Sequence, residues 1–66
     1  MKYILKNYIV DKHKEVWNYT IFDKDMNEVK HLDATPEEAM HIKNFLALES
    51  ISPMQWFNAI SRKHIG

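Results

Sequence analysis

The sequence predicts an α+β domain in which a three-stranded antiparallel β-meander is followed by two α-helices packed on one face of the sheet. Three runs rich in β-branched and aromatic residues, separated by short polar turns, predict the strands. Two helix-start signals, each followed by apolar residues at helical spacing, predict the helices. A chain of 66 residues without linkers or repeats is expected to form one compact domain over residues 1–66.

The strands are expected at residues 3–10, 16–22 and 28–32. The middle run is the clearest, because Trp17, Tyr19 and Ile21 alternate with polar side chains at the period of a strand. Both connections are short and rich in Asp, Asn and Lys, which predicts antiparallel neighbours. The first run is apolar on both faces, so it leaves open which face meets the helices.

Two capping boxes predict where the helices begin. Thr35 and Ser52 are the expected N-caps, each followed by Pro and then, three residues on, by Glu38 or Gln55. The apolar spacing after each box predicts helices over residues 36–49 and 53–64.

The composition argues against several classes of function. The chain has nine Lys and Arg against nine Asp and Glu, no Cys, and one Gly at its end. It therefore lacks a disulfide framework, a thiolate nucleophile and a glycine-rich phosphate loop. None of the four His has metal-ligand spacing, and Asp23-x-Asp25-x-Asn27 fails the calcium-loop template because Glu28 replaces the required Gly. We expect no enzyme, no catalytic residue, no cofactor, no metal and no small-molecule substrate.

The compartment follows from the lengths of the apolar runs. The first run is interrupted at Lys6, too early for the apolar core of a signal peptide, and no stretch is long enough to span a membrane. The lack of Cys fits a reducing environment. We expect a soluble cytoplasmic chain with no membrane partner.

The strands carry more apolar side chains than one covered sheet face requires, and such a surplus is typical of an interface. The side chains expected on the outer sheet face and at the helix edge are Ile4, Tyr8, Val10, Phe22 and Trp56. We therefore predict a small protein-binding module, a regulator or inhibitor that occupies a partner protein's surface. Self-association as a homodimer or larger homo-oligomer is one form of this prediction.

The alternative is a DNA- or RNA-binding regulator. The second helix is expected to place Gln55, Asn58 and Arg62 on one face, and Lys63 is a further candidate contact with nucleic acid. Residues 46–56 also resemble the turn of a helix-turn-helix DNA-binding unit. Ile51 and Ser52 match its apolar-then-Ser turn, Trp56 matches a buried position of its second helix, and Ser50 stands where that family usually has Gly. The resemblance implies that the second helix would contact the nucleic acid.

Overall fold

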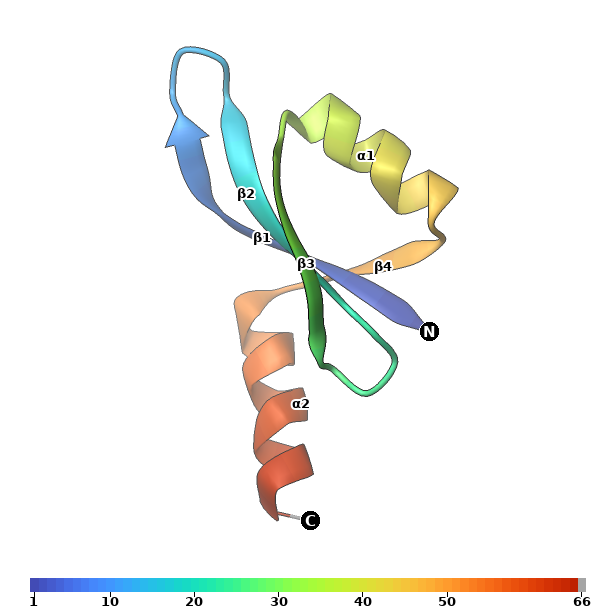
Figure 1. Ribbon diagram of the computed structural model, residues 1–66. Coiled ribbons are helices and arrows are strands. Elements are labelled where there is room, and N and C mark those ends of the chain that lie inside the picture. The colour runs from blue at the N-terminus through green and yellow to red at the C-terminus, as the bar shows by residue number, and fades with distance from the viewer. Residues whose placement is uncertain (66) are drawn as a thin grey trace.

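The computed structural model describes the backbone of residues 1–65 and the side chains of residues 1–63. Its elements are β1 (Lys2–Asp11), β2 (Val16–Phe22), β3 (Glu28–Ala34), α1 (Pro36–Phe45), β4 (Leu48–Ile51) and α2 (Pro53–Ile65). They form a four-stranded sheet of order β3-β2-β1-β4, in which β1 to β3 are antiparallel and β4 runs parallel to β1 (Figure 1). The α+β class and the antiparallel meander are confirmed, but the sheet is mixed.

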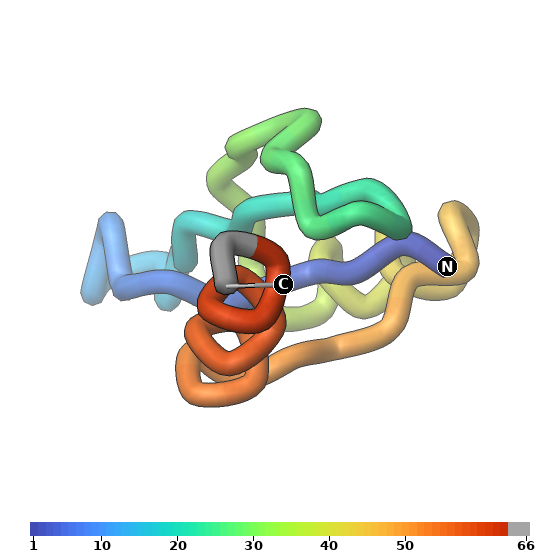
Figure 2. Tube along the Cα trace, turned by 90° about the horizontal axis from the view of Figure 1, so that it is seen from below, coloured from blue at the N-terminus to red at the C-terminus, as the bar shows by residue number. Residues whose placement is uncertain are grey.

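The prediction that both helices pack on one face is wrong. Ile4 pairs with Ile21 and packs in the cluster that includes Ala39 of α1. Phe22, the next residue after Ile21, points to the opposite face, and there its ring lies 6.1 Å from that of Trp56 in α2. Accordingly, Figure 2 shows α2 in front of the strands and α1 behind them. We call these two sides the α1 face and the α2 face.

The first helix ends earlier than predicted, and the residues after it form a strand. Leu46 donates its N–H to the Ile42 carbonyl, and Ala47 then adopts a left-handed conformation with φ 53° that stops the helix. Gly usually occupies such a position, so the sequence carries no stop signal there. Leu48–Ile51 then pairs with β1 from Lys2 to Leu5. Leu48 continues the helical spacing of the preceding apolar residues, which explains why β4 was missed.

Both predicted capping boxes are present. The Thr35 hydroxyl accepts from the Glu38 N–H at 3.2 Å, and the Glu38 carboxylate accepts from the Thr35 N–H at 3.2 Å. The Ser52 hydroxyl accepts from the Gln55 N–H at 3.2 Å, and the Gln55 side-chain oxygen accepts from the Ser52 N–H at 2.7 Å. These bonds satisfy amides that a helix start leaves free, and they set the direction in which each helix leaves the sheet.

The chain is elongated, with principal extents of 42 × 23 × 15 Å. The α1 face holds its main core, built from Ile4, Tyr19, Ile21, Ala34, Ala39 and Leu48. The α2 face has a smaller core around Phe22, which is only 1% exposed. Within residues 1–65, no helix is long and apolar enough to cross a membrane.

Candidate protein-binding surface

Two of the residues predicted to form the interface are buried within the chain. Ile4 is 5% exposed in the core of the α1 face, and Phe22 is 1% exposed beneath α2. The two side chains point to opposite faces of the sheet. The prediction that Ile4 and Phe22 lie together on an uncovered face is therefore wrong.

Tyr8 and Val10 are exposed, as predicted, but a β-bulge separates them from Ile4. Lys6 pairs with Tyr19 and Tyr8 pairs with Asn18, so Asn7 is an extra residue in β1. An extra residue reverses the alternation of the strand beyond it. Tyr8 consequently lies on the α2 face beside Asn18, and it is 61% exposed near the β1–β2 hairpin, away from the part that α2 covers.

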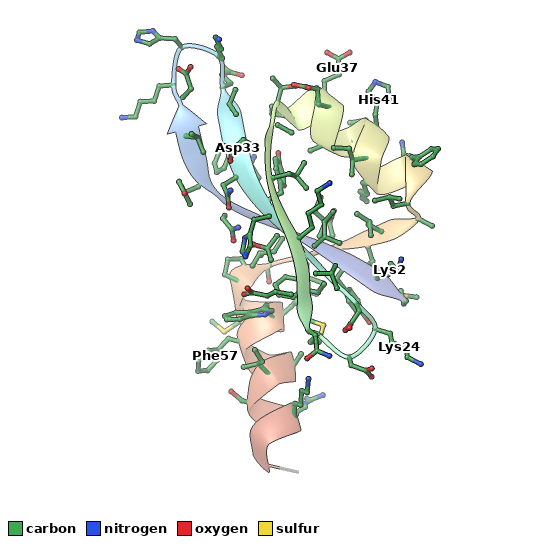
Figure 3. All side chains as sticks on the ribbon, viewed as in Figure 1. Lys2, Lys24, Asp33, Glu37, His41 and Phe57 are labelled. Carbon is green, nitrogen blue, oxygen red and sulfur yellow. The ribbon has the colours of Figure 1, made fainter. Side chains whose placement is uncertain are left out.

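Trp56 anchors α2 to the sheet instead of standing free at the helix edge. Its ring packs against Phe22, and the indole Nε1–H is buried without a hydrogen-bond partner among the described residues. Phe57, the next residue, is 60% exposed and projects away from the sheet (Figure 3). Trp56 is therefore half-buried in the contact between α2 and the sheet.

A ladder of polar side chains crosses the sheet on the α2 face. Asn7 Nδ2 donates to Asn18 Oδ1 at 2.9 Å and to Thr20 Oγ1 at 2.6 Å. Asn18 Nδ2 then donates to Asp33 Oδ1 at 2.9 Å. The bulged Asn7 thus connects β1 to two positions of β2, and Asn18 continues the ladder to β3. These bonds explain why β2 carries the polar residues Asn18 and Thr20 on the α2 face.

The same ladder includes a Thr–His–Glu relay. Thr20 Oγ1 lies 3.1 Å from His31 Nδ1, and His31 Nε2 lies 3.1 Å from Glu28 Oε2. With its hydrogen on Nε2, the His31 ring donates a hydrogen bond from Nε2 to Glu28 and accepts one from the Thr20 hydroxyl at Nδ1. A nucleophile needs access to substrate, but Thr20 is only 3% exposed. The relay therefore has the connectivity of a catalytic triad but serves to join β2 to β3.

A groove with a mainly apolar lining lies between α1 and β3. It has a volume of ≈ 650 Å³. Its walls are Ile21, Leu32, Ile42, Phe45 and Leu46, with Lys30 and His41 at its rim. We call it the α1–β3 groove. The hollow on the other side of α1 has about half that volume, ≈ 320 Å³, and is bordered by Lys6 and Lys43.

The groove presents apolar side chains that the rest of the chain does not cover. Phe45 is 88% exposed and Leu46 is 42% exposed at the end of α1. Both residues belong to the apolar spacing from which the first helix was predicted, and the sequence analysis did not single them out as exposed. Because residues three and four positions after Ile42 normally share its helix face, the sequence carries no signal that Phe45 and Leu46 would be exposed.

Strand β3 forms one edge of the sheet beside this groove. Its neighbour is β2, and on its outer side no strand of residues 1–65 pairs with it. Such an edge offers free backbone N–H and C=O groups to a further strand. The groove and the edge together therefore provide an apolar site next to a row of hydrogen-bonding groups.

The four residues predicted to contact nucleic acid do not act as one free surface. Gln55 is engaged in the α2 capping box. Lys63 Nζ donates to the Asp25 carbonyl at 3.0 Å and to Asn27 Oδ1 at 2.7 Å, which ties α2 to the β2–β3 turn. Asn58 and Arg62 are exposed. The predicted polar face is thus reduced to these two side chains.

The resemblance to a helix-turn-helix unit is not borne out by the arrangement of residues 46–56. The segment that would be the turn contains strand β4, which pairs with β1. The flanking helices lie on opposite faces of the sheet instead of packing on each other (Figure 2). In a helix-turn-helix unit the first helix supports the second, and α1 cannot do so here.

The Asp23–Asn27 turn folds around one carboxylate. Asp23 accepts backbone N–H bonds from Asn27 at 3.0 Å and from Asp25 at 2.9 Å. The Asn27 backbone bond is the main cause that holds the pKa of Asp23 below its ordinary value, with further contributions from the Asp25 bond, the Asn27 side chain and the nearby charge of Lys63. Among the described residues, no group of three His, Asp or Glu side chains converges as metal ligands would.

Comparison of this chain with protein families, with curated proteins and with solved structures finds no match.

Proposed function

We propose that this chain is a protein-binding module, a regulator or inhibitor that acts by occupying the surface of a partner. The observation that carries the proposal is the α1–β3 groove, where the ring of Phe45 stands 88% exposed beside an unpaired strand edge. Exposed aromatic side chains around an apolar hollow are typical of protein interfaces. This surface replaces the outer sheet face that the sequence predicted.

The groove and the edge suggest how the partner is held. An extended segment of the partner adds to β3 through backbone hydrogen bonds, and one of its apolar side chains enters the groove against Leu32 and Phe45. Lys30 and His41 at the rim can donate hydrogen bonds to acidic or carbonyl oxygens of the same segment. Affinity then comes from the backbone bonds and selectivity from the groove.

The test uses a photoreactive benzoylphenylalanine at position 45, with the same group at position 57 as the matched control. Both positions hold an exposed Phe on a helix, 88% and 60% exposed, on opposite sides of the sheet. We expect one discrete protein adduct from position 45 and none from position 57, whether the adduct is this chain or a different protein. Equal labelling from both positions, or none from either, would show that the groove is not a binding surface.

A further inference from the structure

Resting on the proposed function, we infer that the partner is a second copy of this chain, and that the two β3 edges pair antiparallel about a two-fold axis at Leu32. The dimer would have one continuous sheet with the two α1 helices on the same face. The exposed area, the lengths of the two sheet edges, the register across β3 and the shape of the groove favour this dimer.

The chain exposes more surface than its mass requires. Its accessible surface is 5040 Å², whereas a compact monomer of 7.9 kDa exposes about 4,400 Å². The excess of about 600 Å² approaches the roughly 800 Å² that each partner buries in a stable complex. The formal net charge is +0, so two copies approach without long-range repulsion.

The two edges of the sheet are not equally suited to pairing. β4 has four residues, begins directly after the left-handed Ala47 and leads at once into the Ser52 cap of α2. β3 has seven residues. It also borders the groove with the exposed Phe45 and Leu46. The longer edge beside uncovered apolar surface is the one that a second strand would cover.

Symmetry restricts the register of the pair. A two-fold axis perpendicular to the sheet leaves the α1 faces of both copies on the same side. Residues directly opposite each other in an antiparallel pair point to the same face, so the axis must pass through a residue position and not between two positions. An axis at Lys30 sets two ammonium groups against each other. An axis at His31 sets Lys30 against Leu32 of the partner subunit. Neither arrangement matches polarity across the edge.

An axis at Leu32 opposes no like charges and sets Lys30 against a smaller apolar side chain than Leu32. On the α2 face it sets His31 opposite Asp33 of the partner subunit, and Asp33 opposite the partner subunit's His31. On the α1 face it sets Leu32 opposite Leu32 of the partner subunit, with Lys30 opposite the small Ala34 of the partner subunit. Opposed apolar side chains stabilise an antiparallel pair, and this register sets no two like charges directly opposite each other.

This register also joins the two grooves into one. Leu32 lines the α1–β3 groove and would lie on the axis, so the groove of each copy continues into that of the other. The exposed Phe45 and Leu46 of each copy then border a shared apolar space. A groove that is open on one side in the single chain becomes closed by its own copy.

The register is tested with single cysteines, because the chain has none of its own. Residues directly opposite in an antiparallel pair have Cα atoms about 4.5–5.5 Å apart, within disulfide reach. We expect Leu32→Cys to form a covalent dimer under mild oxidation and His31→Cys, which lies out of alignment with its own copy, to form none. Circular dichroism of the reduced variants checks that both fold.

Sedimentation equilibrium from low micromolar to millimolar chain tests the association itself. We expect a concentration-dependent monomer–dimer equilibrium that Phe45→Glu weakens at least tenfold and Phe57→Glu leaves unchanged. Both side chains are more than half exposed, so neither substitution should prevent folding.

The outcomes separate this inference from the proposed function. A dimer that responds to Phe45→Glu and cross-links through Leu32→Cys supports it. A dimer that cross-links through His31→Cys, or that is unaffected by Phe45→Glu, overturns the pairing through β3 at Leu32. A monomer at every concentration overturns the dimer, and the photoreactive group at position 45 then decides separately whether the groove binds a different protein.

Discussion

At the scale of single residues, the placement of the surface side chains depends on Asn7. Its insertion as a bulge reverses the alternation of β1, so that Ile4 and Tyr8 point to opposite faces. The bulge is stabilised by the side chain that occupies it, because Asn7 donates to both Asn18 and Thr20 of β2. Asn7 therefore decides which face Tyr8 points to, and a second register shift between Ile9 and Asp11 leaves Val10 without a partner residue in β2.

The Asp23 turn leads to a prediction about acid stability. Hydrogen bonds, chiefly that from the Asn27 backbone, hold the pKa of Asp23 below its ordinary 3.8 in the folded chain. The ionised carboxylate therefore stabilises the folded state above that value, and the contribution is lost as the pH falls through the lowered pKa. We expect urea unfolding to show a free energy that declines below about pH 4. In Asp23→Asn the decline should be shallower.

The control for this prediction is Asp25→Asn. It removes the same charge from the same turn, but the Asp25 structural bonds involve its backbone N–H and carbonyl and not its carboxylate. If Asp25→Asn flattened the pH dependence as much as Asp23→Asn, the effect would come from net charge and not from the hydrogen-bonded carboxylate.

At the scale of elements, the sequence predicts best where side-chain chemistry acts locally. Both capping boxes and the β1–β3 meander formed as expected, because the caps bond within three residues and the turns are built from their own polar side chains. The end of α1 was missed because Ala47 takes a left-handed conformation normally marked by Gly. β4 was missed because a four-residue strand has too little periodicity to distinguish it from the end of a helix.

The candidate site was predictable only in part. The surplus of apolar side chains correctly indicated that some would be exposed, and Tyr8 and Val10 are. The groove could not be located, because it depends on α1 crossing one face while α2 covers the other. That arrangement is decided by β4, whose pairing with β1 carries the chain from one face to the other.

The packing of α2 on the sheet depends mainly on one side chain, that of Trp56. Trp56 packs on the buried Phe22, whereas Phe57 beside it is 60% exposed. We expect Trp56→Ala to lower the free energy of unfolding by about 2–4 kcal/mol, because it leaves a cavity over Phe22. Phe57→Ala should change it by less than about 0.5 kcal/mol. Chemical denaturation followed by far-ultraviolet circular dichroism compares the two, and equal effects would contradict this account of how α2 is held.

At the scale of the whole molecule, the shape of the chain and its small core both favour association. The chain has two small cores on opposite sides of one sheet, and its radius of gyration is 12.3 Å where about 10.8 Å is typical of a compact domain of 66 residues. Without Cys it cannot be reinforced by disulfides. A chain of this size gains little from its core alone, so further burial through association would add substantially to its stability.

The dimer therefore predicts that thermal stability depends on chain concentration. Folding coupled to association is favoured by mass action, so we expect the melting temperature to rise by about 3–6 °C for each tenfold increase in concentration. Phe45→Glu should remove this dependence, because it places a charge at the edge of the shared apolar space, while Phe57→Glu should retain it. Differential scanning calorimetry at several concentrations measures all three chains. A melting temperature of the unsubstituted chain that stays constant while the unfolding remains reversible would mean that the isolated sheet, with both of its edges free, is stable by itself.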